Sequence, residues 1–163
     1  MIKIQKKVHI AFGLFCSLAF IYLLKTFFGK TPNFLSILIC ISSAYIFSTF
    51  PDIDTRLPIQ HRGITHSLTF FLIPIGLFLM TYIFWWNNPL MIWFIIGYVI
   101  GYLAHLVSDS LTQHGVPWFH PFSEKTYGIR IFNTGNKLIQ SILCLILWLI
   151  NLILIFINLS KSF

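Results

Sequence analysis

Long apolar runs separated by short polar segments divide the chain into five candidate membrane helices. About 20 consecutive apolar residues are enough for a helix to cross the hydrocarbon core of a bilayer. The five runs cover residues 8–28, 33–50, 64–86, 90–111 and 138–159. This pattern predicts an all-α fold: a polytopic membrane helix bundle of about five spans, forming a single integral membrane domain over residues 1–163.

Small residues in two of these runs predict how the helices pack. The run 33–50 is short and contains four serines, which indicates a helix buried inside the bundle rather than one facing lipid. Gly97 and Gly101 are four residues apart in the run 90–111, a spacing that permits close approach of two helices. We expect these glycines to serve packing within the chain rather than dimerisation.

Composition agrees with a membrane protein and excludes a soluble domain. Only 9% of the residues are charged, against about 25% in soluble domains, and the mean hydropathy is +0.84. The net charge of +7 does not indicate a nucleic-acid partner, because the basic residues lie at segment ends and form no basic stripe. They favour membrane orientation and contact with anionic lipid headgroups.

The basic residues also predict an orientation. With the N-terminus inside, eight of them flank the inner face, namely Lys3, Lys6, Lys7, Arg56, Arg62, Lys125, Arg130 and Lys137. Lys25, Lys30 and Lys161 fall outside. The positive-inside rule therefore predicts a multi-pass protein of the cytoplasmic (inner) membrane with a cytoplasmic N-terminus and an external C-terminus. The inner loops are then residues 51–63 and 112–137.

All the histidines and acidic residues fall on this inner face. They are His9, His61, His66, His105, His114, His120, Asp52, Asp54, Asp109 and Glu124. His105 and Asp109 are four residues apart, so they share one helix face. Taken alone this pair could simply join two helices by a hydrogen bond, and His9 alone could be an interfacial histidine. Their convergence with the other acids and imidazoles indicates a functional site.

The loop segment FPDIDTRLPIQHRGITHS brings two carboxylates close together. Asp52 and Asp54 are two residues apart and would point the same way on an extended strand. Pro51 and Pro58 rule out a continuous helix and favour a rigid turn. Two adjacent carboxylates repel each other unless cations neutralise them. The available cations are Arg56, Arg62 and a metal ion.

Mixed imidazole and carboxylate groups suit zinc, manganese or iron. The candidate metal ligands are His9, Asp52, Asp54, His61, His66, His105 and Asp109. This set exceeds the needs of one tetrahedral ion, so we expect a site for two or more divalent ions, with zinc as the first choice. His114 and His120 are not included among the ligands.

Three motifs carry a resemblance to a known family. HRGITHSL, FPDID and GYLAHLVSDSLTQHGVPWFHPFS resemble the YdjM-like family of predicted inner-membrane metal-dependent hydrolases. The matching positions are His9, Asp52, Asp54, His61, Arg62, Thr65, His66, His105, Asp109 and Thr112. Val8 stands where the family often has threonine. The resemblance covers about three quarters of the chain and implies a membrane-bound hydrolase with a metal cofactor.

A looser similarity to the His/Asp zinc sites of phospholipase C enzymes favours a phosphoester substrate. We therefore expect cleavage of a lipid-derived phosphoester at the cytoplasmic interface by metal-activated water. Arg62 and Asp54 are the candidate catalytic residues, with Arg62 as a bidentate clamp on the phosphate.

Two other functions are compatible with the same residues. In a metal or proton transporter, the histidines and aspartates would line a pathway, but their confinement to one face argues against this. In a non-catalytic scaffold, the metal would be structural and fully enclosed by its ligands.

Overall fold

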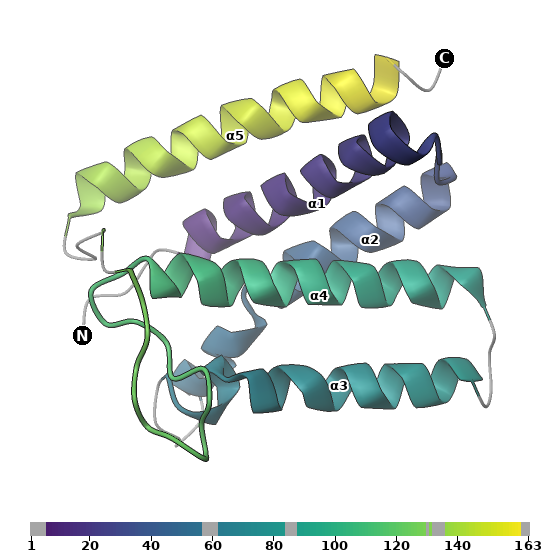
Figure 1. Cartoon of the computed structure of the whole chain (residues 1–163). Coiled ribbons are helices and arrows are strands. Elements are labelled where there is room, and N and C mark those ends of the chain that lie inside the picture. The colour runs from purple at the N-terminus through teal and green to yellow at the C-terminus, as the bar shows by residue number, and fades with distance from the viewer. Residues whose placement is uncertain (1–5, 57–61, 84–87, 130, 132–135, 161–163) are drawn as a thin grey trace.

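The computed structural model describes residues 6–56, 62–83, 88–129, 131 and 136–160, which form a bundle of helices (Figure 1). The α-helices are α1 (Lys6–Phe28), α2 (Phe34–Phe47), α3 (Leu68–Thr81), α4 (Pro89–Ser110) and α5 (Lys137–Ser160). Two 3-10 helices, η1 (Phe50–Arg56) and η2 (Ile64–His66), lie between α2 and α3 in the chain. Within the described residues no β-strand is present, and Val116 and Tyr127 form an isolated antiparallel bridge. The predicted all-α class is confirmed.

In the described part of the chain, four helical segments are long and apolar enough to cross a membrane: Lys6–Phe28, Phe34–Thr55, Pro89–Ser110 and Lys137–Asn158. The second of these joins α2 to η1. Helix α3 has 14 residues and a length of about 21 Å, less than the roughly 30 Å hydrocarbon core of a bilayer.

Helix α3 starts later than the sequence predicts. The expected span began at residue 64, whereas the α-helix begins at Leu68, and residues 84–86 of that span lie outside the described part of the chain. The reason is local: Ser67 caps the helix by accepting a hydrogen bond from the Phe70 N–H at 3.2 Å. The residues before this cap form η2 and turn towards the polar end of the bundle.

Helices α2 and α4 pack with their backbones in direct contact, and glycines make this possible. A Cβ atom at Gly101 would lie 2.9 Å from Ala44 Cα, and a Cβ atom at Gly97 would lie 2.7 Å from Ser43 Cβ. These separations are too short for non-bonded carbon atoms, so neither position has room for a side chain. Gly97 and Gly101 therefore pack within the chain, as predicted, and they fix α4 one turn before His105.

Replacing Gly101 with alanine is expected to destabilise the bundle. The new methyl group would overlap Ala44, and overpacking of this kind costs about 1–3 kcal/mol. Gly76→Ala in α3 is the matched control, because an added Cβ atom there would meet no described atom of another element within 4 Å, and alanine favours a helix over glycine by about 1 kcal/mol. Thermal unfolding in detergent compares the two variants. Equal stability of Gly101→Ala and Gly76→Ala would contradict the packing described here.

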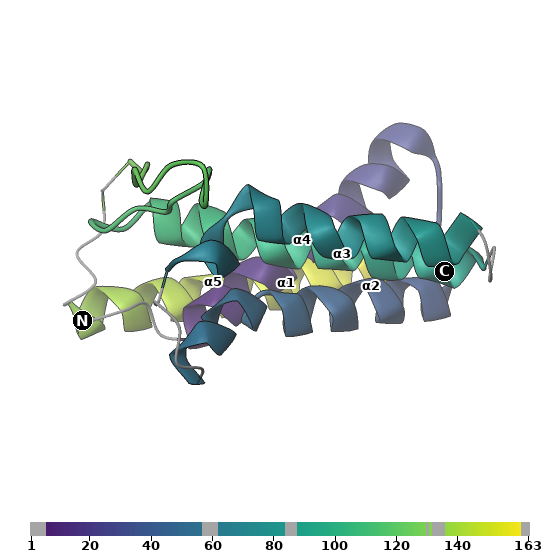
Figure 2. The same ribbon diagram turned by 90° about the horizontal axis from the view of Figure 1, so that it is seen from below.

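Helix α5 lies along α1, and buried asparagines connect the two (Figures 1 and 2). Asn151 Nδ2 donates a hydrogen bond to the Ala11 carbonyl at 3.0 Å, and Asn158 Nδ2 donates to the Leu18 carbonyl at 3.4 Å. Hydrogen bonds between membrane helices hold helix pairs in register. Helix α5 therefore braces α1, the helix that carries His9.

Several chain segments meet at one end of the bundle, on the left in Figure 1. They are the start of α1, the end of α4, η1 and η2, and the view in Figure 2 shows the same grouping. Successive helices alternate in direction, so α1 begins and α5 ends at opposite ends of the bundle. The fold thus gathers the polar segments of the chain at one end.

Candidate metal centre

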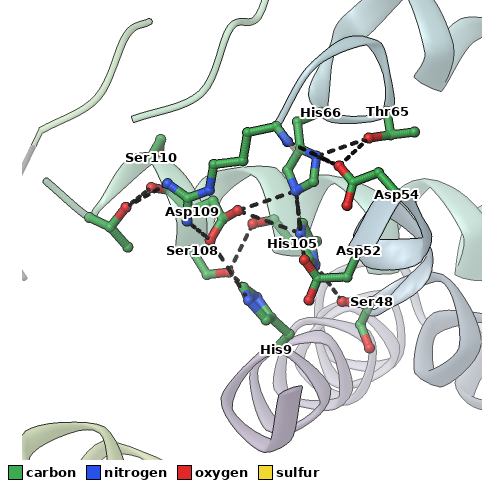
Figure 3. A network of polar contacts seen from close by, with 12 residues as sticks. His9, Ser48, Asp52, Asp54, Thr65, His66, His105, Ser108, Asp109 and Ser110 are labelled. Atoms are coloured by element: carbon green, nitrogen blue, oxygen red, sulfur yellow. Dashed lines mark hydrogen bonds and ion pairs between the residues drawn. The ribbon is translucent and has the colours of Figure 1, made fainter. Parts of the chain in front are cut away.

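Five of the predicted metal ligands meet at this end of the bundle (Figure 3). Helix α1 supplies His9, η1 supplies Asp52, η2 supplies His66, and α4 supplies His105 and Asp109. Each side chain is at most 4% exposed. Burial of so many ionisable groups costs free energy unless they are paired with one another or with a cation.

In both His105 and His9, the ring nitrogen Nδ1 points away from the cluster and faces a hydrogen-bond acceptor. His105 Nδ1 lies 2.8 Å from the Ser48 carbonyl, which can only accept, so Nδ1 carries the proton. His9 Nδ1 lies 2.7 Å from Ser108 Oγ, whose own proton is donated to the His105 carbonyl at 2.8 Å. His9 Nδ1 is therefore also the donor. In both neutral rings the unprotonated nitrogen is Nε2, which faces the centre of the cluster.

His66 is held in the same way from the opposite side. Its Nδ1 lies 3.3 Å from Asp54 Oδ2, and its Nε2 lies 3.4 Å from Asp109 Oδ2. Burial lowers the pKa of His66, but the hydrogen bonds with Asp109 and Asp54 outweigh burial and raise this pKa above its ordinary value. Without a metal ion, the two carboxylates thus favour a proton on this ring.

The three Nε2 atoms and two carboxylates form a set dominated by acceptors. His66 Nε2 lies 3.2 Å from His105 Nε2, so these two nitrogens can hydrogen-bond each other only when His66 Nε2 carries a proton. His9 Nε2 lies 3.7 Å from Asp109 Oδ1, and His105 Nε2 lies 3.6 Å from Asp109 Oδ2. Asp52 Oδ2 is buried and has no hydrogen-bond partner among the described residues. Such a set fits a bound cation.

The ligand atoms fall into two overlapping groups. One group is His9, His105 and Asp109, and the other is Asp52, His66 and His105; within each, the ligand atoms lie within 4.8 Å of one another. His105 belongs to both, yet its Nδ1 is engaged by Ser48, so only Nε2 is free to bind one ion. A second ion would therefore need a further donor, such as the second oxygen of Asp109.

Arg62 supports the centre through Asp109. Its Nη2 donates to Asp109 Oδ1 at 2.8 Å, and its Nη1 donates to Thr112 Oγ1 and the Gly115 carbonyl, both at 3.2 Å. The side chain is buried and the backbone is held at a φ of 61°, in the left-handed region. These contacts neutralise and orient Asp109. The role of Arg62 as a phosphate clamp stays a prediction: Nη1 and Nη2 are engaged, and Nε is buried with no hydrogen-bond partner among the described residues.

Asp54 lies behind His66 rather than among the two ligand groups. Its Oδ2 accepts hydrogen bonds from Thr65 Oγ1 at 2.8 Å and from the Arg62 backbone N–H at 3.0 Å. A carboxylate behind a histidine fixes the tautomer and orientation of the ring at many metal sites. The roles of Asp54 as a metal ligand and as a catalytic residue stay predictions. His61 lies outside the described residues.

The directions of Asp52 and Asp54 differ from the expectation of an extended strand. Both lie on the 3-10 helix η1, where residues two apart point to different sides. Asp52 Oδ1 faces His66 Nε2 at 3.9 Å, whereas Asp54 faces the opposite nitrogen of the same ring. Pro51 is accommodated because it sits in the first turn of η1, where its missing N–H is not needed. The expected rigid turn is thus a short helix.

Sequence reasoning did not single out Ser48 or Ser108. The Ser48 contact uses a backbone carbonyl, which leaves no trace in residue type. Ser108 lies three residues after His105 on α4. Residues three apart are neighbours on a helix surface, so the sequence could have indicated Ser108 as a polar partner near the candidate ligands.

Replacing Ser108 with alanine is expected to weaken metal binding about 10–100-fold, because His9 loses the acceptor that orients it. Ser110→Ala is the matched control: Ser110 Oγ also donates to the carbonyl three residues earlier, at 2.7 Å, and this hydroxyl hydrogen-bonds none of the described metal-ligand candidates. Titration with zinc against a chelating dye measures both. Equal zinc affinities of the two variants would contradict this role of Ser108.

The fold and the site together define a helical membrane protein with a buried histidine–aspartate cluster at one end of its bundle. The chain belongs to the YdjM inner membrane protein family, whose model matches residues 4–162. The resemblance seen in the sequence is therefore confirmed. No curated protein and no solved structure matches the chain.

Proposed function

We propose that this protein is a membrane-bound metal-dependent hydrolase that cleaves a phosphoester of a lipid at the cytoplasmic membrane interface. The observation that carries the proposal is the orientation of three imidazoles. His9, His66 and His105 each direct Nε2 towards the carboxylates of Asp52 and Asp109, while an acceptor engages each Nδ1. This arrangement is the usual one for histidines that bind a metal ion.

The proposed ion is zinc, with manganese or iron as alternatives, held by His9, His105 and Asp109 or by Asp52, His66 and His105. A bound divalent ion would act as a Lewis acid and lower the pKa of water. The protein's own residues prepare the site. Asp54 orients His66, Ser108 orients His9, and Arg62 offsets the charge of Asp109.

The position of the cluster favours a hydrolase over a transporter. A transport pathway would need polar groups along the bundle, whereas the described ligands lie at the ends of α1 and α4 and in the two 3-10 helices. The middle of the α2–α4 contact is closed by Gly97 and Gly101 packed on backbone atoms. This packing leaves no room for a side chain between these two helices at Gly97 and Gly101.

A lipid substrate is supported by the surroundings of the cluster. The segment after α4 exposes aromatic side chains, with Phe119 at 52% and Phe122 at 87% exposed. Exposed aromatic residues at the end of a membrane bundle are typical of contact with the headgroup region. The headgroup of a lipid that stays in the bilayer would therefore lie at the same depth as the cluster.

A hydrolysis assay on the purified protein tests this proposal. The protein, reconstituted in phosphatidylcholine nanodiscs with added zinc or manganese, is given a panel of lipid phosphomonoesters and phosphodiesters. Product release is expected with metal, and it should be lost with a chelator and in His105→Gln. His114→Gln is the control, because His114 is exposed and lies in neither ligand group. Activity that survives both the chelator and His105→Gln would contradict the proposal.

A further inference from the structure

A cavity of about 210 Å³ lies beside the cluster, at the start of α1, the end of α2 and η1. Its walls are formed by Lys6, Ile46, Thr49, Phe50, Asp52 and Ile53. Of these, Asp52 is the residue shared with the candidate metal centre. The cavity therefore offers a ligand a route to that centre from the side of η1.

The cavity distinguishes the two ligand groups. It reaches the group of Asp52, His66 and His105 through Asp52, whose Oδ2 is buried without a hydrogen-bond partner among the described residues. Neither His9 nor Asp109 is among the residues that line the cavity, and Ser108 and Arg62 hydrogen-bond these two residues. Catalytic metal sites keep a position open to substrate, whereas structural sites are closed. Asp52 is thus the ligand through which this cavity reaches the centre.

The walls of the cavity combine apolar and charged chemistry. Ile46 and Ile53 are 52% and 39% exposed, so the apolar wall continues onto the outer surface of the bundle, which meets lipid. Lys6, at the first turn of α1, supplies a positive charge at the same cavity. An apolar wall with a cation beside it fits an amphiphile that carries an anionic headgroup.

The negative charge of Asp52 affects whether an anion can bind in the cavity. A carboxylate in the wall repels an anionic headgroup, and a divalent ion at the Asp52 group would reverse this repulsion. Binding of an anion in the cavity is therefore expected to depend on metal.

We propose that this cavity binds the phosphomonoester headgroup of a membrane amphiphile, with Lys6 contacting the phosphate and the acyl chains leaving past Ile46 and Ile53. The inference rests on the proposed function, because it assigns the substrate class and the approach direction for that same site. Lys6 replaces Arg62 as the first cation that the phosphate meets, since the donors Nη1 and Nη2 of Arg62 already have partners.

The test is site-resolved photolabelling with a lipid that cannot be hydrolysed. The probe is a phosphonate analogue of phosphatidic acid with a diazirine near the headgroup, presented in phosphatidylcholine nanodiscs to zinc-loaded protein. Labelling is expected to map to residues 46–53 and to fall on removal of zinc. Uniform labelling of all lipid-facing helices, or labelling independent of zinc, would overturn the proposal.

Two variants and their controls sharpen the test. Thr49→Trp fills the cavity, and Lys6→Gln removes its charge; each is expected to reduce labelling about fivefold or more without changing zinc content. Ser42→Trp and Lys7→Gln are matched controls, because both residues are exposed neighbours that do not line the cavity. Unchanged labelling in both cavity variants would overturn the proposal.

Competition separates a lipid headgroup from free phosphate. Inorganic phosphate and glycerol 3-phosphate are added at increasing concentration to the labelling reaction. Weak competition supports an amphiphile, whereas complete competition by either soluble ion would show a phosphate site with no need for a chain and would overturn the proposal. Labelling at residues 46–53 without any hydrolysis in the activity assay would contradict the proposed hydrolase function but not the lipid site. Hydrolysis together with labelling elsewhere would contradict the lipid site in this cavity but not the hydrolase function.

Discussion

Replacing Asp109 with asparagine is expected to reduce zinc affinity by more than about 100-fold. This exceeds the loss of about 10–100-fold that follows when a residue that only orients a metal ligand is removed. Asp109 is the centre of the cluster: its two oxygens face Nε2 of His9, His66 and His105 at 3.4–3.7 Å. Asparagine keeps the shape of the side chain but removes the charge and one ligand oxygen. Zinc titration of the metal-free protein in detergent measures the effect.

Glu124→Gln is the control for Asp109→Asn. Glu124 is an exposed acid in the segment after α4, and it lies in neither ligand group. The same change of charge at Glu124 is expected to leave zinc affinity unaltered. Similar affinities for Asp109→Asn and the unmodified protein would show that the cluster does not bind metal through Asp109.

Replacing Arg62 with methionine is expected to lower the free energy of unfolding by about 3–5 kcal/mol. The change leaves Asp109 buried, at 2% exposure, without the guanidinium that donates to it at 2.8 Å. Removing one partner of a buried ion pair costs this much because the other charge stays uncompensated. Chemical unfolding in detergent, followed by tryptophan fluorescence, measures the loss.

Two further variants define what Arg62 does. Lys125→Met, at an exposed lysine that lies 5.5 Å from the Tyr127 ring, is expected to change stability by no more than about 0.5 kcal/mol. Arg62→Lys keeps the charge but not the planar fork, so an intermediate loss of stability is expected. If Arg62 positions Asp109 and does not contact the phosphate, the photoreactive lipid phosphonate should label Arg62→Lys as strongly as it labels the unmodified protein. If Arg62→Met proved as stable as Lys125→Met, the buried ion pair between Arg62 and Asp109 would be contradicted.

The sequence predicted the helices well because their lengths and apolar runs are local properties. The runs 8–28, 90–111 and 138–159 correspond closely to α1, α4 and α5. The run 64–86 was assigned too early a start, because hydropathy does not reveal that Ser67 caps α3 and that His66 turns away from it. Periodicity also did not distinguish the 3-10 helix η1 from a turn, since two prolines in one segment disfavour any regular helix.

The composition of the cluster was also predictable, but its geometry was not. Once the spans are set, His9, Asp52, His66, His105 and Asp109 must lie at one end of the bundle, and the structure brings these five together. Their partners depend on tertiary contacts between distant residues. His9 and Ser108 are 99 residues apart, and His105 meets a backbone carbonyl 57 residues away. No sequence pattern encodes such contacts, so the support of each ring could be found only in the folded chain.

Elemental analysis of the purified protein shows whether the cluster is a metal centre. The protein is prepared in detergent without chelators, then measured for zinc, manganese and iron per chain, alongside Asp109→Asn and Glu124→Gln. We expect at least one tightly held ion per chain in the unmodified protein and in Glu124→Gln, and a clearly lower metal content in Asp109→Asn. An unmodified protein that carries no metal and takes up none when zinc is added would show that the cluster is not a metal centre.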